Sequence, residues 1–407
     1  MLEHAEAIYA ATGLSIVRPS EFIARLDELA REEEYQRTVL AGTKQVLHQR
    51  VSVVEDRVID AIVGPNESNR DLQTRLRQFL ADPLRYSCEQ ISFVTGEILA
   101  FYVVDTQSDF HRVPLFRVAA ANLTGTLSRA ILTTLLRDIV KRKRCGLIIS
   151  ESSMATRQKA ACEDIGFREG PNGWTKLTIC GIHDQFELAK IVESSEVNDP
   201  IVRCFAENLN NPLTSQVESE LEHALWPAKF RTSLQHNFIV PIRPDFAQAL
   251  FDEHLASQTL YGADIDLALN SESVYYRSAR QQIVKYPGRI LWYISDKGEL
   301  SGVKSIRACS RIAEVVVDKP KILFRRFQRL GVYEWSDVFR TAGNDLDTNV
   351  MAIRFHDTEL LRPVKWDVFQ EVLRANDVRT NLESPVSISS KVFEEIYALA
   401  FDSPQVC

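Results

Sequence analysis

One short stretch of the chain has residue types that could hold an anion at the start of a helix. Residues 122–129 read Asn-Leu-Thr-Gly-Thr-Leu-Ser-Arg, and apolar residues at helical spacing follow them over 131–136. The first N–H groups of a helix have no partner within it, and together with the helix dipole they favour a bound phosphate. Glycine in such a turn lets the backbone approach phosphate oxygens closely. The residue types of this stretch therefore allow an anion at a helix N-terminus near Gly125.

The same residues have a second interpretation. Thr124, Thr126 and Ser128 are ordinary hydroxyl residues that cap the free N–H groups of a helix whether or not a phosphate is present. Arg129 could bind a phosphate, but an exposed helical arginine is the commoner case. Both interpretations stay open from the sequence alone.

Four residues are candidates for proton transfer. Asp105, Asp109 and His111 stand in a loop before an apolar strand, where a base could deprotonate an amine. Cys162 is the fourth candidate, although a cysteine in an apolar helix is most often a small buried side chain. No Ser/His or Cys/His pair supports a covalent intermediate.

A further set of residues combines aromatic rings with cations. Such a mixture holds single-stranded RNA or a flipped base, and stacking contributes ~1–3 kcal/mol per base. Side chains alternate along a strand, so only part of the set can face one cleft, and strand aromatics are usually core. We expect Tyr276, Arg277 and Lys304 to contact a nucleic acid. The set within residues 275–293 comprises Tyr275, Tyr276, Arg277, Arg280, Lys285, Tyr286, Arg289, Trp292 and Tyr293.

Composition sets the class of protein. A length of 407 residues predicts two or three domains, and the contents of 45% hydrophobic and 25% charged residues are typical of a soluble globular chain. The net charge of −7 excludes a uniformly basic nucleic-acid coat. Seven cysteines without C-x-x-C spacing predict reduced thiols in a cytoplasmic protein, with no zinc site and no other metal. No segment approaches the ~20 apolar residues of a membrane span, so we expect no membrane partner.

The elements from Glu97 to Lys176 have a recognisable order. The long helix is preceded by an apolar hairpin arm and a strand (113–120). It is followed by a second strand, a helix (156–167) and a third strand that contains Trp174. This order resembles the GNAT acetyltransferases, in which pantetheine adds to a splayed strand edge and the pyrophosphate lies at the next helix N-terminus. The resemblance implies acetyl-CoA as cofactor. It assigns cofactor binding to Val118, Thr124, Gly125, Thr126, Ser128 and Arg129.

The chain departs from the GNAT pattern at several positions. Thr124 replaces the usual cation, and Leu127 and Arg129 stand where small residues are expected. Cys162 replaces the tyrosine that often serves the family as general acid, whereas Gly166-Phe167 matches the close of the family's next helix. The resemblance therefore supports the fold more strongly than the activity.

The C-terminal part of the chain has a different character from residue 238 onward. A strand, Arg-Pro and a helix open it (239–253), and the β-rich runs 273–278, 289–296 and 302–312 follow. Ser387 to Ser390 are N-cap candidates for a closing helix. With the closing SPVSIS (384–389), this pattern resembles the PUA-like superfamily, particularly its ASCH and EVE branches. The resemblance implies a small β-barrel with helices that binds RNA or a modified nucleotide.

The predicted fold class is α+β, with a GNAT-like mixed sheet flanked by helices and a C-terminal PUA-like β-barrel. Near the start of the chain, residues 13–29 (GLSIVRPSEFIARLDEL) resemble the closing strand and helix of PIN nucleases. This resemblance implies a remnant that is unable to cut RNA. The alternative is a packing helix at the edge of a domain. The expected domains are an N-terminal helical segment (1–45), a GNAT-like domain (46–180), a helical linker (181–235) and a PUA-like domain (236–407).

Three functions remain open at this point, of which the plainest is that the barrel recognises a small ligand; the other two are as follows. The first is transfer of an acetyl group from acetyl-CoA to an amine on, or bound to, RNA that the barrel delivers. The second is a non-catalytic regulator, in which the degenerate GNAT-like domain is a packing or homodimerisation scaffold and the barrel binds RNA or a modified nucleotide. The PIN-like segment favours the second function slightly, with a protein partner in a toxin–antitoxin or defence system.

Overall fold

The computed structural model describes residues 46–64, 67–93, 95–107, 110–119, 124–194, 200–250, 272–295, 304–328, 330 and 333–400. These residues form two compact units, which we call the first unit (residues 46–234) and the second unit (residues 235–400). The predicted PIN-like segment 13–29 lies outside the described residues.

A seven-stranded mixed sheet forms the centre of the first unit, in the order β1-β2-β3-β4-β5-β7-β6. Strands β4 and β5 run parallel, and every other neighbouring pair is antiparallel. This is the strand and helix order that the sequence predicted. The strands are β1 (Val46–Arg50), β2 (Tyr86–Phe93), β3 (Ile98–Asp105), β4 (Phe110–Val118), β5 (Gly146–Ile149), β6 (Arg168–Gly170) and β7 (Gly173–Leu177).

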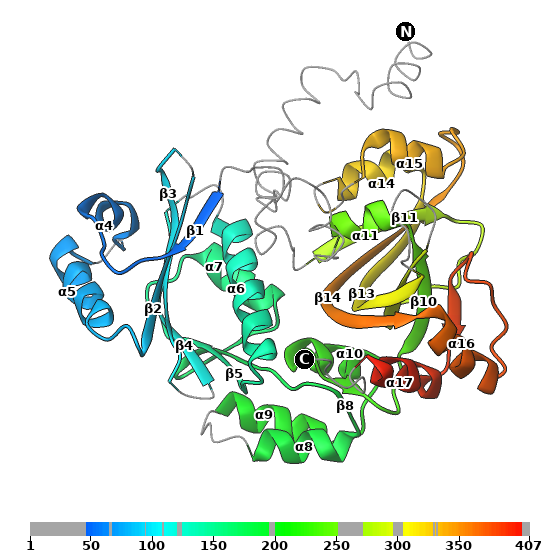
Figure 1. The fold of residues 1–407 in the computed structure, drawn as a ribbon, viewed down its shortest axis with the longest axis horizontal. Coiled ribbons are helices and arrows are strands. Elements are labelled where there is room, and N and C mark those ends of the chain that lie inside the picture. Colours follow the sequence, from blue (N-terminus) through cyan, green and yellow to red (C-terminus); the bar gives the residue numbers. More distant parts are fainter. Residues whose placement is uncertain are drawn as a thin grey trace, which may run out of the picture. The chain divides into compact units, whose positions relative to one another are not determined.

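Helices cover both faces of this sheet (Figure 1). One face packs against α4 (Asp56–Ile62) and α5 (Asn69–Leu80), and the other packs against α6 (Thr124–Lys141) and α7 (Thr156–Asp164). Every residue of β3 is buried because the strand lies at the centre of the sheet with helices on both sides. This explains its continuous apolar sequence.

Three further helices complete the first unit: α8 (Gln185–Glu193), α9 (Pro200–Leu209) and α10 (Ser215–Ala224). They share a hydrophobic core with Ile148 and Leu177 of the sheet, and β8 (Ile182–His183) pairs with β9 (Lys229–Phe230). The segment expected to be a helical linker is thus helical and packs within the first unit.

A buried lysine fixes α10 to the sheet. The Nζ of Lys176 on β7 donates to the carbonyl oxygens of Ile165, after α7, and His223, in the last turn of α10, at 2.6 Å each. The last carbonyls of a helix have no partner within it, and a cation suits the negative end of the helix dipole. Lys176 therefore satisfies the ends of two helices at once.

The second unit contains a six-stranded sheet in the order β11-β14-β13-β12-β10-β15. Only β10 and β12 run parallel among these strands, and register shifts interrupt the pairing of β13 with both of its neighbours. The strands are β10 (His236–Ile242), β11 (Glu272–Ser278), β12 (Gly288–Ile294), β13 (Ser305–Asp318), β14 (Val350–Lys365) and β15 (Val386–Ile388). The helices are α11 (Pro244–Leu250), α14 (Pro320–Phe327), α15 (Trp335–Thr341), α16 (Trp366–Ala375) and α17 (Ser390–Leu399).

Local sequence signals account for parts of this unit. Trp292 is fully buried, and its indole N–H donates to the Ser310 hydroxyl at 2.9 Å, so the ring's polar atom is satisfied in the core. Ser389 caps α17 by accepting from the Val392 N–H, within the predicted 387–390 capping segment. The predicted α+β class is confirmed.

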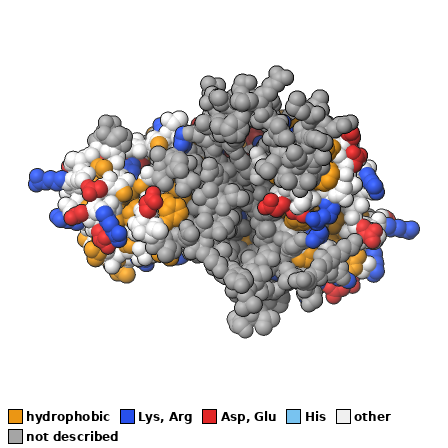
Figure 2. Space-filling model, turned by 90° about the horizontal axis from the view of Figure 1, so that it is seen from above, with side chains coloured by type: hydrophobic (Ala, Val, Ile, Leu, Met, Phe, Trp, Pro, Cys, Tyr) orange, Lys and Arg blue, Asp and Glu red, His pale blue; other side chains and the backbone are white. Residues whose placement is uncertain are grey.

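Charges of both signs intermix on the described surface. In the face that Figure 2 shows, acidic and basic side chains lie side by side on the coloured parts of both units, and neither presents a single-sign face there. Among the described helices, none is both long and apolar enough to cross a membrane.

Candidate functional site

Strands β4 and β5 pair only along the first part of β4. Phe110–Val113 pairs with Gly146–Ile149, and Pro114 follows, which has no N–H to donate. The pairing of β4 with β3 also shifts register at this point. Beyond Pro114, no described strand pairs with the β5-facing edge of β4. This is the gap in which the resemblance to acetyltransferases places pantetheine.

Side chains from the β5 side already occupy this edge. The Phe116 N–H donates to Glu151 Oε2 at 3.4 Å, and Gln158 Nε2 donates to the Phe116 carbonyl oxygen at 3.1 Å. Glu151 is 5% exposed and Gln158 is 3% exposed, so both are buried in the gap. The hydrogen-bonding groups that an added strand or a pantetheine chain would need at Phe116 are therefore taken.

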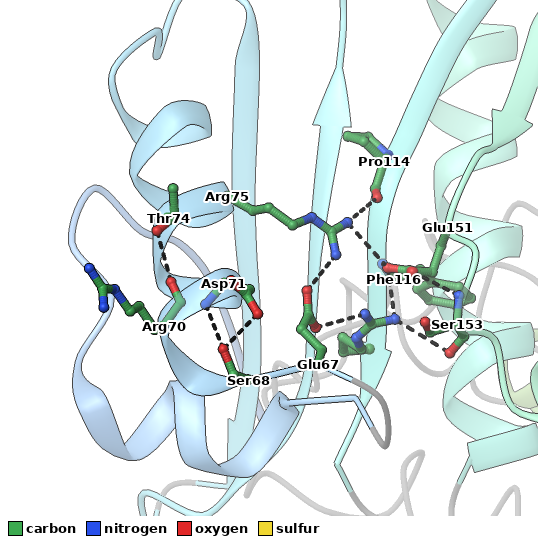
Figure 3. A network of polar contacts seen from close by, with 11 residues as sticks. Glu67, Ser68, Arg70, Asp71, Thr74, Arg75, Pro114, Phe116, Glu151 and Ser153 are labelled. Carbon is green, nitrogen blue, oxygen red and sulfur yellow. Dashed lines mark hydrogen bonds and ion pairs between the residues drawn. The ribbon is translucent and has the colours of Figure 1, made fainter.

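An ion network holds Glu151 in this position (Figure 3). Its carboxylate lies 2.8 Å from Arg117 Nη1 and 3.9 Å from Arg75 Nη2. Glu67, in the loop before α5, connects the same two arginines at 2.6 Å from Arg75 and 3.1 Å from Arg117. Two cations and two carboxylates thus join α5, β4 and the segment after β5, and their formal charges balance.

The network also sets the ionisation of Glu67. Burial acts to raise the pKa of its carboxyl, but hydrogen bonds from Arg75 and Arg117 outweigh burial, and the pKa of Glu67 lies below its ordinary value. Glu67 is therefore charged at neutral pH, as the balanced network requires.

The start of α6 differs from the predicted phosphate site. Ser128 is fully buried, and Thr124 is nearly so, which places both hydroxyls away from solvent. Arg129 binds Asp164 of α7, with Nε 3.1 Å from the carboxylate. Its guanidinium also lies against Gly125, where an added Cβ would come 3.1 Å from Nη1. The side chain of Thr126 and residues 120–123 lie outside the described residues.

The edge of β4 and the start of α6 determine whether acetyl-CoA fits the first unit. The cofactor needs an open strand edge and a helix start that a pyrophosphate can reach. Here the Phe116 edge is saturated by Glu151 and Gln158, Val118 packs against the core, and Arg129 lies over Gly125 in an ion pair with Asp164. The residues present do not fit an extended pantetheine chain along β4. Of the six predicted cofactor residues, Ser128 is corrected because its hydroxyl is enclosed in the core.

The predicted proton-transfer residues are not brought together. Cys162 belongs to the core and burial raises the pKa of its thiol, so the prediction of an acid at this position is corrected. His111 is buried at the start of β4, five residues before Phe116 and on the α6 side of the sheet. Asp109 lies outside the described residues.

The second unit carries a cavity of about 500 Å³ with the composition of a ligand site. Aromatic, cationic and acidic side chains line it together, from β11, β12, the start of α16 and the segments around them. These lining residues include Arg243, Tyr275, Tyr293, Lys304, Trp366 and Glu383. We call this cavity the aromatic pocket.

Backbone geometry positions Lys304 and Trp366 in the aromatic pocket. The Trp366 N–H, at the first residue of α16, donates to the Lys304 carbonyl oxygen at 2.8 Å. The Trp366 ring lies 5.9 Å from the ring of Tyr293 and retains partial exposure. The Tyr275 hydroxyl donates to the Pro241 carbonyl at 3.2 Å, which fixes its ring at the wall of the pocket. The backbones of a lysine and of a partly exposed tryptophan are therefore held together at the lining of the pocket.

The three predicted nucleic-acid contacts have different outcomes. Lys304 lines the aromatic pocket. Tyr276 is 3% exposed and its hydroxyl donates to the Leu323 carbonyl, so it faces the core, and the prediction that it contacts a ligand is corrected. Alternation along β11 places Tyr275 in the pocket instead. Arg277 is half-buried, burial lowers the pKa of its guanidinium, and its Nε has no hydrogen-bond partner among the residues that the structure describes.

Sequence reasoning missed Trp366, Arg243 and Glu383. Trp366 stands at a strand-to-helix junction far from the aromatic cluster at 275–293, and only the pairing of β13 with β14 brings it to Lys304. Its sequence signal was an aromatic residue at a helix start, which is too common to single it out.

No family model matches the chain, and no curated protein matches it. Solved structures of two kinds are similar to parts of it. The ASCH protein from Zymomonas mobilis is 18% identical, with 42% of this chain and 96% of that chain covered and a TM-score of 0.31.

Other similar structures are GNAT acetyltransferases. The ribosomal-protein-S18-alanine N-acetyltransferase from Escherichia coli is 19% identical, with 30% of this chain and 79% of that chain covered and a TM-score of 0.24. A GNAT family acetyltransferase from Elizabethkingia anophelis, solved with acetyl-CoA bound, is 13% identical over 31% of this chain and 78% of that chain, with a TM-score of 0.25. The neighbours are the two families that the sequence resembles. The architecture of each unit rests on the strand orders described above.

Proposed function

We propose that the protein binds an unpaired base of single-stranded RNA in the aromatic pocket, and that the first unit is a scaffold without acetyl-transfer activity. The observation that carries the binding proposal is the position of Lys304 beside Trp366 at the pocket. The scaffold proposal is supported by the occupied edge of β4 at Phe116.

A base suits the aromatic pocket for physical reasons. Every base offers a face to an exposed ring, and stacking on an aromatic side chain contributes ~1–3 kcal/mol. Trp366 supplies such a ring, and Lys304 and Arg243 supply cations for the neighbouring phosphates. A volume of about 500 Å³ is in the ordinary range of small-ligand sites.

Side-chain oxygens on one side of the pocket favour RNA over DNA. Asn381 and Glu383 line it, and their oxygens can accept a hydrogen bond from a ribose 2′-hydroxyl. That hydroxyl is the group by which a protein distinguishes the two nucleic acids. The six free cysteines among the described residues suit the reducing cytoplasm, where such a protein would meet RNA.

Fluorescence anisotropy tests the binding proposal. A labelled single-stranded RNA should bind the full chain saturably, and a DNA oligonucleotide of the same sequence should bind more weakly. The Glu383→Gln variant should retain RNA binding but lose part of this preference, because an amide accepts the 2′-hydroxyl less strongly than a carboxylate does. Equal affinity for RNA and DNA in the unchanged protein would contradict the assignment to RNA.

Isothermal titration tests the scaffold proposal separately. Millimolar acetyl-CoA should give no heat of binding with the full chain, because the backbone groups at Phe116 are occupied. The opposite result is a saturable heat of binding that changes in the Gln158→Glu variant. It would show that the cofactor reaches this strand edge, and the scaffold proposal would then be abandoned.

A further inference from the structure

The first unit has a cavity at the opposite end of β4 and α6 from the filled Phe116 edge. It has a volume of about 460 Å³ and lies between strands β1–β4 and the C-terminal half of α6. Its lining includes His111, near the start of β4, together with residues of the last two turns of α6 and Arg142 after it. The GNAT resemblance places cofactor at the other ends of both elements, so this cavity is a different site. We call it the imidazole pocket.

Strand register builds the floor of the imidazole pocket. Arg50, Glu89 and Tyr102 stand directly opposite one another across β1, β2 and β3 and therefore share one face of the sheet. His48 Nε2 lies 2.9 Å from the Tyr102 hydroxyl and 3.3 Å from the Glu89 carboxylate. The Ser87 hydroxyl donates to Glu89 at 2.6 Å. Beneath the rest of α6 the same face of the sheet is apolar, so the polar side chains on the floor of the pocket are a local exception.

A second imidazole faces the same cavity. His111 is 3% exposed and lines the pocket, and among the described residues none forms a hydrogen bond with its ring. Burial lowers the pKa of His111, Arg144 and Arg142 lower it further, and Asp138 and Asp105 act in the opposite direction. The ring is therefore neutral at pH 7 and presents one N–H donor and one acceptor.

Cations form the wall of the pocket. Arg137 and Lys141 of α6 line it together with Arg142 directly after the helix, and Asp138 pairs with Arg142 at 2.8 Å. Arg50 lies on the floor, where its Nη2 donates to the Pro83 carbonyl at 2.7 Å. The helix dipole alone would favour basic residues at the C-terminal end of a helix, but these residues also line a cavity that contains buried hydrogen-bond donors. Four cations against two carboxylates, Glu89 and Asp138, give the lining a net positive charge.

We infer that the imidazole pocket binds a small organic phosphate, with the phosphate between Lys141 and His111 and the remainder over the polar floor. A dianion matches the excess of positive charge, and the neutral His111 ring can donate a hydrogen bond to a phosphate oxygen. The size of the cavity suits a molecule of nucleotide size. This inference concerns the first unit alone, so it stands or fails independently of RNA binding by the aromatic pocket.

Histidine NMR of the full chain tests the inference with inorganic pyrophosphate as probe. The His48 and His111 ring signals, assigned with His48→Gln and His111→Gln variants, should shift saturably, and the pKa of His111 should rise on binding. The signals of His183 and the exposed His236 should not shift. The exposed Lys141→Ala variant should weaken binding about tenfold, whereas Lys159→Ala, which removes an equal charge from the surface of α7, should not.

Three results would overturn the inference. The His48 and His111 signals could fail to saturate, or Lys141→Ala could bind pyrophosphate as well as Lys159→Ala does. Citrate at equal ionic strength could also produce the same saturable shifts, which would show a general anion site without selectivity for phosphate.

Discussion

Arg117 on β4 and Glu151 after β5 form an ion pair of 2.8 Å across the gap where the two strands separate. Both side chains are buried, and Glu151 also accepts the backbone N–H of Phe116. One carboxylate therefore satisfies a strand edge and an arginine together. This relationship turns a gap that could admit a ligand into a closed part of the core.

Removing Glu151 should be costly. In Glu151→Ala, Arg117 and Arg75 would share a single carboxylate, Glu67, in a buried position. Breaking one partner out of a buried ion pair typically costs 3–5 kcal/mol, and we expect the free energy of unfolding to fall by about that amount. Urea unfolding measures it. Glu169→Ala, at a surface pair with Lys159, is the matched control and should change stability by about 0.5 kcal/mol or less. Equal losses in the two variants would contradict the account.

The stability that Glu67 provides should depend on pH. Because the pKa of Glu67 is lower in the folded protein than in the unfolded chain, its contribution is complete at neutral pH. It declines once the pH falls below about 4.3, the value of an unfolded glutamate, and is lost as the pH falls through the folded value. The difference in stability between the unchanged protein and Glu67→Gln, measured by urea unfolding, should therefore be largest at neutral pH and should shrink as the pH falls below about 4.3. A difference that stays constant with pH would refute this role.

Lys176 should be needed for the packing of α10. The Lys176→Met substitution keeps the length of the side chain but leaves the carbonyls of Ile165 and His223 without this donor. An unsatisfied buried polar group costs about 1–3 kcal/mol, so we expect a loss of at least that size. Hydrogen exchange of the Lys176→Met variant should also show that α10 (Ser215–Ala224) opens faster than β3 (Ile98–Asp105). Unchanged exchange in α10 would contradict the tethering role.

Trp366 should carry the stacking part of RNA binding. Trp366→Ala removes the partly exposed ring and should weaken RNA binding by about 1–3 kcal/mol, while Trp366→Phe should retain part of the affinity. Circular dichroism must first show that both variants remain folded, because the Trp366 ring also packs against Phe369. Phe186→Ala removes a ring that is 70% exposed on the first unit and serves as control. The stacking role fails if Trp366→Ala and Phe186→Ala bind RNA equally well.

The sequence predicted the elements well where a local pattern determines them. The apolar run of β3 indicated a buried strand, and Ser389 lay within the predicted capping segment of α17. These features depend on residues adjacent in the chain. The mixed sheet followed from the order of strands and helices, because a parallel β4–β5 pair requires a crossover such as α6.

Features that depend on distant pairs could not be predicted. Glu151 is separated from Phe116 by 35 positions, and only the register of β4 and β5 shows that its side chain fills the gap. Tyr276 and Tyr275 are adjacent aromatic residues, and which of them faces the core depends on the helices that cover β11. Trp366 reaches Lys304 through two long strands whose pairing contains register shifts.

The salt dependence of RNA binding in Lys304→Ala tests the central claim most directly. If Lys304 contacts a phosphate, its removal should weaken RNA binding about tenfold and reduce the slope of log affinity against log salt by about 0.7. Lys391→Ala removes the same charge from an exposed position on α17 and is the matched control. The account predicts that only Lys304→Ala changes affinity and slope. If the two variants bind RNA with the same affinity and slope, the aromatic pocket is not where the RNA binds.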